Sequence, residues 1–149
     1  MRLVLQRVTR ATVTVDGAEV GAIGPGLAIL VGVGHDDTPA VAKALADKTC
    51  DLRIFRDEGG LTNRSLMDVG GEVLAISQFT LYADARKGRR PSFLGAAPPA
   101  LGDSLYQAFM AALEARGVRV ARGIFGAEMA VELVNDGPMT IWLDSAATA

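Results

Sequence analysis

The apolar run LAILVGV, residues 27–33, decides how this chain folds. The tripeptide Gly24-Pro25-Gly26 comes directly before it and is typical of a turn. Because the run is continuous rather than alternating, it predicts a strand that is buried on both faces. It is the longest apolar run in the sequence, yet much shorter than the roughly 20 residues that a membrane-spanning helix needs.

Upstream of this run, the sequence predicts a β-hairpin. Residues 1–15 alternate between apolar and polar side chains, and Thr12-Val13-Thr14-Val15 is strongly β-prone. The dipeptide Asp16-Gly17 favours a tight hairpin turn. A second strand is therefore expected over Glu19–Ile23, beside the first.

Two main helices are expected downstream. Thr38 offers an N-cap hydroxyl and Pro39 suits the first helical position, so a helix should run from Pro39 to about Cys50. A second amphipathic stretch spans Gly102–Arg116, and Gly117 stands in the usual C-terminal position.

Five further strands complete the expected order of elements. They are Leu52–Phe55, Glu72–Leu81, Val118–Ile124, Met129–Val134 and Met139–Leu143, with a polar loop over Arg56–Gly71. This order predicts an α/β or α+β-like sandwich in which a mixed sheet curls toward a barrel. We expect one domain over residues 1–149, because no linker, repeat or low-complexity stretch divides the chain.

Composition and charge restrict the function classes. Half of the 149 residues are hydrophobic, which is enough for a core without disulfides or metals. The net charge of −2 argues against a protein that coats nucleic acid with its whole surface. The opening MRLVLQRVTRATVTV is charged and alternating rather than a secretory signal, and Cys50 is the one cysteine. We therefore expect a cytoplasmic protein from a reducing compartment, without a membrane partner.

The side-chain inventory excludes several kinds of site. A serine or cysteine triad would have to use His35, the one histidine, which stands in a turn-like segment and is expected to be an ordinary loop residue. One histidine and one cysteine do not make a zinc site, and no phosphate-binding glycine loop is present. We expect neither metal nor cofactor. An enzyme built from this chain must use positioned backbone donors and groups of its substrate.

Two segments are specific enough to indicate a function. The first is SQFTLYAD, residues 77–84, which continues into RKGRRPSF, residues 86–93. The second is NDGPMT, residues 135–140, between two apolar stretches. Taken as bare residues, the hydroxyls of Ser77 and Thr80 fit ordinary strand positions, and the basic run fits a solvated surface. Its interleaving with aromatics also suits a single-stranded RNA end.

Together these segments resemble the signature motifs of the D-aminoacyl-tRNA deacylases, SQFTLYAD…KG.RPSF and N.GP.T. The resemblance extends over nearly the whole chain, including MRLVLQRVTRATVTVDG, GPGLAILVGV, LRIF and FGAEMAVELVNDGP. Met139 departs from the pattern, where a smaller aliphatic side chain is usual, and Ala85 occupies a variable position.

The resemblance implies a homodimer with composite active sites at the subunit interface. Members hydrolyse the ester between a D-amino acid, or glycine, and tRNA, and they leave L-aminoacyl-tRNA intact. The implied catalytic residues are Ser77, Gln78, Phe79 and Thr80. The implied selectivity element is Gly137-Pro138, a cis peptide that reaches into the pocket of the partner subunit. The basic residues Arg86, Lys87, Arg89 and Arg90 would contact tRNA, with no DNA partner expected.

Two alternative functions stay open at this point. A non-catalytic RNA-binding module would use the basic run as a clamp, without turnover and without distinguishing D- from L-charged tRNA. A general small-ester hydrolase would cleave simple esters without tRNA, although such an enzyme should carry a nucleophile and a base.

Overall fold

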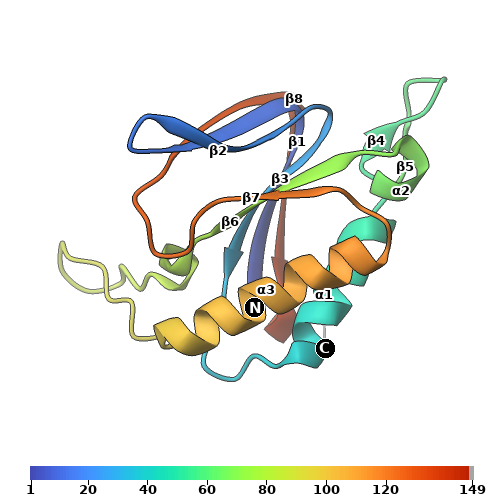
Figure 1. The fold of residues 1–149 in the computed structure, drawn as a ribbon. Coiled ribbons are helices and arrows are strands. Elements are labelled where there is room, and N and C mark those ends of the chain that lie inside the picture. Colours follow the sequence, from blue (N-terminus) through green and yellow to red (C-terminus); the bar gives the residue numbers. More distant parts are fainter. Residues whose placement is uncertain (148–149) are drawn as a thin grey trace.

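Six strands form one curved mixed sheet in the computed structural model, which describes residues 1–147 (Figure 1). Strand β1 (Arg2–Val15) pairs antiparallel with β2 (Ala18–Ile23), β3 (Gly26–Gly32) and β8 (Ala130–Asp144). Strand β3 continues in parallel to β6 (Glu72–Ser77), and β6 to β7 (Val120–Arg122). The mixed, curled sheet that the sequence predicts is therefore confirmed.

Local signals place the hairpin and the helices as expected. Asp16 and Gly17 both have positive φ, 50° and 79°, as a tight two-residue hairpin turn requires. Helix α1 spans Pro39–Asp51, and the Thr38 hydroxyl accepts a hydrogen bond from the amide of Val41 at 3.3 Å. Helix α3 spans Pro99–Ala115, and Gly117 follows it with φ of +87°. No helix among residues 1–147 is long and apolar enough to cross a membrane.

The sheet separates two hydrophobic cores. Helices α1 and α3 lie side by side and cover one face, where they bury residues such as Leu3, Leu5 and Ile29 (Figure 1). The second core lies inside the curl of the sheet and includes Val13 and Leu74. Strand β3 contributes to both, as the continuous apolar run predicts: Leu27, Ile29 and Val31 face the helices, and Ala28 and Leu30 face the curl.

The expected strand over Leu52–Phe55 is wrong. Only Phe55–Arg56 is extended enough to form strand β4, which pairs with β5 (Thr62–Arg64) in a separate two-stranded sheet. The segment expected to be loop also contains the short helix α2 (Leu66–Val69), begun by a capping box between Ser65 and Asp68. Ile54 and Phe55 are apolar because they are buried in the core. They do not join the main sheet; Phe55 pairs with Arg64 of β5 instead.

The strand expected over Glu72–Leu81 ends early. Strand β6 stops at Ser77, and residues Phe79–Tyr82 form a 3-10 helix, η1. The neighbouring strand β3 ends at Gly32, and its pairing with β6 ends at Val31 and Ser77. Beyond this point a strand would have no partner, so the backbone turns away.

The two strands expected at the end of the chain are one. Strand β8 runs from Ala130 to Asp144 and pairs with β1 on both sides of residues 136–139. Asn135 lies opposite Val8 and Thr140 opposite Gln6, so residues 136–139 bulge out opposite Arg7. The Gly-Pro segment therefore does not reverse the chain as a turn would.

Candidate active site

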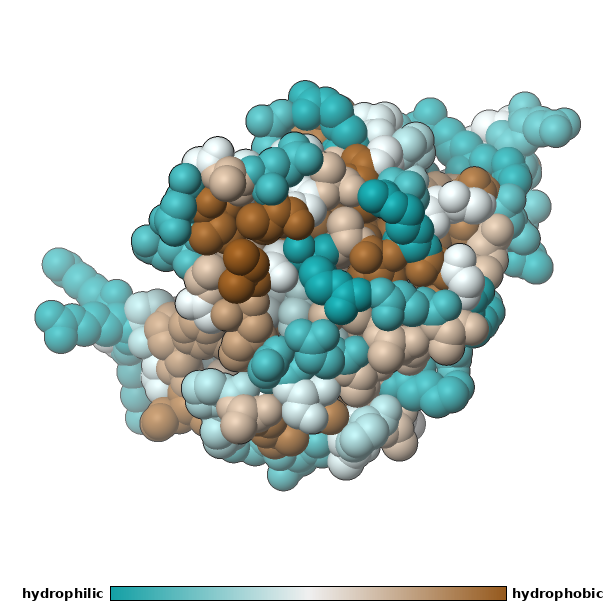
Figure 2. All heavy atoms as spheres, viewed as in Figure 1, coloured by the Kyte–Doolittle hydropathy of each residue, from teal (hydrophilic) through white to brown (hydrophobic). Residues whose placement is uncertain are grey.

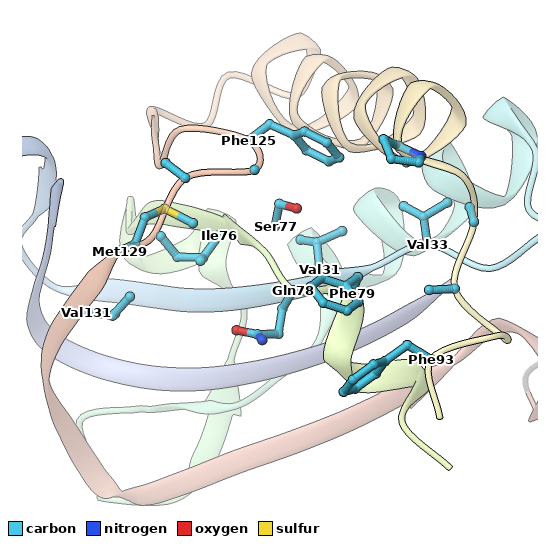
Figure 3. Close-up of a pocket in the computed structure, with 16 residues that line it drawn as sticks. Val31, Val33, Ile76, Ser77, Gln78, Phe79, Phe93, Phe125, Met129 and Val131 are labelled. Atoms are coloured by element: carbon cyan, nitrogen blue, oxygen red, sulfur yellow. The ribbon is translucent and has the colours of Figure 1, made fainter. Parts of the chain in front are cut away.

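A cavity of about 610 Å³ opens where β3 and β6 end, next to η1 (Figure 3). Its floor comes from the sheet, and the first turn of α3 and the segment between β7 and β8 close its other sides. The lining residues are Val31, Val33, Ile76, Ser77, Gln78, Phe79, Phe93, Ala96, Ala97, Pro99, Gly102, Phe125, Gly126, Ala127, Met129 and Val131. Three of the four expected catalytic residues, Ser77, Gln78 and Phe79, thus line one cavity.

The backbone at the edge of this cavity changes from strand to 3-10 helix at Gln78. The Gln78 amide donates to the carbonyl of Val31 at 2.8 Å and completes the strand pairing. Its carbonyl accepts from the amide of Leu81 at 3.2 Å and begins the helix. The first amides of a helix have no acceptor within it. The N–H groups of Phe79 and Thr80 stand at this position, beside the cavity, as two adjacent hydrogen-bond donors.

Thr80 supports the site rather than lining it. The Gln78 side-chain amide donates a hydrogen bond to the Thr80 hydroxyl, which ties the two side chains together across the start of η1. Thr80 itself is not among the residues around the cavity. Its hydroxyl is therefore connected to the cavity through the side chain of Gln78.

The cavity is apolar apart from Ser77, Gln78 and the backbone. Val31, Val33 and Ile76 form its floor, and Phe79 and Phe93 meet edge to face at its mouth, with ring centroids 5.1 Å apart (Figure 3). An apolar wall excludes water and strengthens hydrogen bonds made inside it. The cavity thus suits a reaction in which a few backbone donors meet a developing negative charge.

Gly137 and Pro138 are exposed at the crest of the β8 bulge, outside the cavity of their own chain. The peptide bond between them is cis, as the resemblance implies. Beneath the bulge, Arg7 is 3% exposed and donates to the carbonyls of Ile54 at 2.6 Å and Asp136 at 3.2 Å. Arg7 also pairs with the Asp136 carboxylate at 3.1 Å, so a buried cation fixes the base of the bulge.

The basic segment forms a projecting hairpin, visible as a hydrophilic protrusion in Figure 2. Paired backbone hydrogen bonds between Asp84 and Ser92, at 2.8 and 2.9 Å, close its base. Arg86 is held by Asp84 through contacts of 2.9 and 2.7 Å, and this pairing lowers the pKa of Asp84 well below its usual range. Lys87, Arg89 and Arg90 are exposed and make no ion pair within residues 1–147. The four basic residues are therefore not equivalent.

The one histidine and the one cysteine both lie outside the cavity. His35 is exposed, and its Nε2 lies 2.8 Å from the carbonyl oxygen of Leu94, away from the cavity. Cys50 is buried, and burial raises the pKa of its thiol. Among residues 1–147, no group of three or more histidine, cysteine or acidic side chains is placed to hold a metal ion.

Two parts of the site were not predicted from the sequence. Phe125 and Met129 form the roof of the cavity, but their apolar character is equally typical of a core. Arg7 could have been found, because it shares the alternation of Leu3 and Leu5 and so places a charge on a buried face of β1.

Comparison with known proteins supplies independent information about this chain. The family model described as D-Tyr-tRNA(Tyr) deacylase matches residues 4–144. The D-aminoacyl-tRNA deacylase of Deinococcus deserti is 62% identical over 97% of this chain and 99% of its own length. The protein of the same name from Roseiflexus castenholzii is 61% identical over 98% of this chain and 93% of its own.

Two solved structures share the fold. One is titled "c-Myc DNA Unwinding Element Binding Protein", with a TM-score of 0.90 and 40% identity, over 97% of this chain and 98% of that one. The other is a probable eukaryotic D-amino acid tRNA deacylase, with a TM-score of 0.83 and 20% identity, over 95% and 97%. The matched family model and the close relatives, taken with the motifs at residues 77–93 and 135–140, show that this chain belongs to the D-Tyr-tRNA(Tyr) deacylase family.

Proposed function

We propose that this protein hydrolyses the ester bond between a D-amino acid and the terminal adenosine of tRNA, and so removes mischarged tRNA before translation. The observation that carries the proposal is the apolar cavity beside η1, with the amides of Phe79 and Thr80 at its edge, in a chain of the deacylase family. Because charged tRNA is made and used in the cytoplasm, we propose the cytoplasm as the place of action.

The chemistry requires little from side chains. Water adds to the ester carbonyl carbon, the carbonyl oxygen becomes negative, and the bond to the ribose oxygen then breaks as that oxygen takes up a proton. One well-aimed donor to such an oxyanion is worth about 10²–10³-fold in rate. The amides of Phe79 and Thr80 supply donors at the start of η1. The family resemblance suggests that the ribose 2′-hydroxyl of the substrate activates the water, so no histidine is needed.

We propose a two-fold homodimer in which each cavity is completed by the partner. Gly137 and Pro138 are exposed and lie outside the cavity of their own chain, so they are free to approach the cavity of a second copy. Exposed apolar side chains on β8, namely Val131, Val134 and Trp142, offer surface for the association. A single self-complementary patch generates a closed dimer.

Chiral selectivity follows from a backbone wall in this arrangement. Once the amino group and the carbonyl of the substrate are fixed, D- and L-esters differ only in the places of the side chain and the hydrogen. Gly137 has a φ of +123°, and a Cβ there would lie 2.8 Å from Nη2 of Arg7, so glycine lets the exposed backbone of the bulge rest directly on the buried arginine. Pro138 fixes φ and keeps the wall rigid. An L side chain would meet this wall, whereas glycine would be admitted because it has no side chain.

We propose RNA rather than DNA as the nucleic-acid partner. The basic hairpin supplies Lys87, Arg89 and Arg90 for phosphates, next to the aromatic mouth of the cavity. A mechanism that uses the 2′-hydroxyl requires ribose at the reacting end.

The first prediction compares three substrates. We expect rapid release of the amino acid from D-tyrosyl-tRNA and from glycyl-tRNA, and little release from L-tyrosyl-tRNA, because the cavity excludes the L side chain. Release is measured as acid-soluble labelled amino acid, with free D-tyrosine ethyl ester as the control for a general esterase. Binding of all three charged tRNAs without turnover would instead identify an RNA-binding module.

The second prediction concerns the hydroxyls of the site. Thr80→Ala and Ser77→Ala should each lower kcat by about tenfold without abolishing activity, because both changes leave the backbone donors in place. Loss of a true nucleophile costs several orders of magnitude. Complete inactivation of folded Thr80→Ala under single-turnover conditions would replace this mechanism with covalent catalysis through Thr80.

The third prediction concerns selectivity and assembly together. Pro138→Ala should loosen the wall and lower the ratio of D- to L-tyrosyl-tRNA hydrolysis by about tenfold or more. Pro25→Ala, at an exposed proline in the turn between β2 and β3, should leave this ratio unchanged. Sedimentation of the wild type at micromolar concentration should show twice the chain mass of 15.6 kDa. A fully active species at the single-chain mass would contradict the composite site.

The fourth prediction separates the basic residues of the hairpin. Replacing Lys87, Arg89 and Arg90 by alanine should weaken tRNA binding and reduce the salt dependence of log Kd by about 0.7 for each phosphate that is no longer neutralised. Arg86→Ala should change the slope less, because Asp84 already neutralises Arg86. Binding is measured by filter retention between about 50 and 200 mM salt, the range over which phosphate neutralisation changes affinity most clearly. An unchanged slope in the triple variant would leave the hairpin a solvated surface.

A further inference from the structure

Tyr82 is the last residue of η1, two positions after Thr80, and it does not line the cavity. Its ring is half-buried behind the cavity wall that Val33, Ala96 and Ala97 form. This wall is held together by the bridge between Gly34 and Ala96 and by the Ala97 amide, which donates to the Val33 carbonyl at 2.9 Å.

The Tyr82 ring fits a slot that two glycines leave open. A Cβ on Gly34 would lie 2.7 Å from the Tyr82 hydroxyl oxygen and 2.8 Å from Cζ, which is closer than such atoms approach. A Cβ on Gly95 would lie 3.4 Å from Cδ1 of the same ring. Gly34 follows β3 and Gly95 belongs to the segment after the basic hairpin, so the ring is wedged between both strips of the wall.

The other face of the ring is covered by Arg2. The Arg2 guanidinium lies 4.4 Å from the ring centroid, and it also donates to the carbonyl of Leu81 at 2.9 Å. Arg2 in turn pairs with Asp144 at 3.0 Å, at the far end of β8. The end of η1 is therefore held against the sheet at the same point where the ring is held against the wall.

The Tyr82 hydroxyl adds a weaker contact. It donates to Asp37 at 3.4 Å, and the same carboxylate oxygen accepts the Gly34 amide at 2.6 Å. Burial is the main cause that raises the pKa of Tyr82, so the hydroxyl keeps its proton at neutral pH. The ring, rather than the hydroxyl, makes the close contacts with the wall and with Arg2.

We propose that Tyr82 is a positioning residue for deacylation: its ring holds η1 at a fixed distance from the cavity wall, and thereby aims the amides of Phe79 and Thr80 at the ester carbonyl. The proposal rests on the deacylase function proposed above. It assigns to Tyr82 no contact with substrate, since Tyr82 is not among the residues that line the cavity.

This role affects catalysis more than binding. The amides of Phe79 and Thr80 matter chiefly when negative charge develops on the carbonyl oxygen, so their displacement lowers kcat. A displacement of about 1 Å in a catalytic group can cost about 100-fold in rate. The apolar contacts that hold the substrate come from other lining residues, so KM should change little.

The test begins with Tyr82→Leu and Tyr82→Phe. We expect kcat for D-tyrosyl-tRNA to fall by about 30- to 100-fold in Tyr82→Leu with KM within about threefold of the wild type. Tyr82→Phe keeps the ring and should restore kcat to within about threefold. Leu45→Ala, a core change on α1 remote from the cavity, is the control for lost stability and should keep kcat unchanged. Equal losses of kcat in Tyr82→Leu and in this control would overturn the proposal.

A double-mutant cycle with Gly34→Ala guards against misfolding of any one variant. In the wild-type background the new Cβ displaces the ring, so kcat should fall by about tenfold or more. In the Tyr82→Leu background the clashing ring atoms are gone, and Gly34→Ala should change kcat by less than about twofold. Additive effects would show that the ring does not connect wall and helix. An inactive wild type would refute both proposals, whereas an active wild type with additive effects would refute only the positioning role.

Discussion

Strand β1 belongs to two hydrophobic cores at once, and the rest of the fold accommodates this constraint. In its first half, Leu3 and Leu5 face the helices, whereas in its second half Val13 faces the inside of the curl. Since side chains alternate strictly along a strand, residues of the same parity reach different cores only where a bulge adds one residue between them. Val8 and Arg10 of β1 pair with the consecutive residues Asn135 and Val134 of β8, so Thr9 is the extra residue at which the two faces of β1 are exchanged.

The bulge of β8 is a second irregularity in the pairing of the same two strands. Residues 136–139 take up the extra length opposite Arg7, and the arginine satisfies the carbonyl of Asp136 that the ladder no longer pairs. The same bulge lifts Gly137 and Pro138 out of the sheet, where a second chain is able to reach them. The irregular pairing of β1 with β8 thus presents the segment to which we assign selectivity.

The sequence predicts those parts of the structure that depend on neighbours in the chain. The turn at Asp16-Gly17, the Thr38 cap and the glycine after α3 are local, and all three are confirmed. The early end of β6 and the continuity of β8 depend on where β3 and β1 offer partners, and these partners are distant in sequence. The expected strand over Leu52–Phe55 is wrong for the same reason, because apolar side chains there mark burial without pairing.

The candidate site also depends on contacts that are distant in sequence, because the hydrogen-bond donors that we propose for it are backbone amides. Residue types in SQFTLYAD do not reveal that the chain leaves the sheet at Gln78 and exposes two amides. The backbone leaves the sheet there because β3 ends at Gly32, and the ring of Tyr82 packs η1 against the cavity wall. In a site that uses backbone amides instead of a nucleophile, the rate depends on how accurately the amides are placed. The side chains that hold this backbone therefore matter as much as the reacting groups. In the mechanism that we propose, Arg7 under the bulge and Tyr82 behind η1 have no contact with substrate and act by holding the backbone of the site in place.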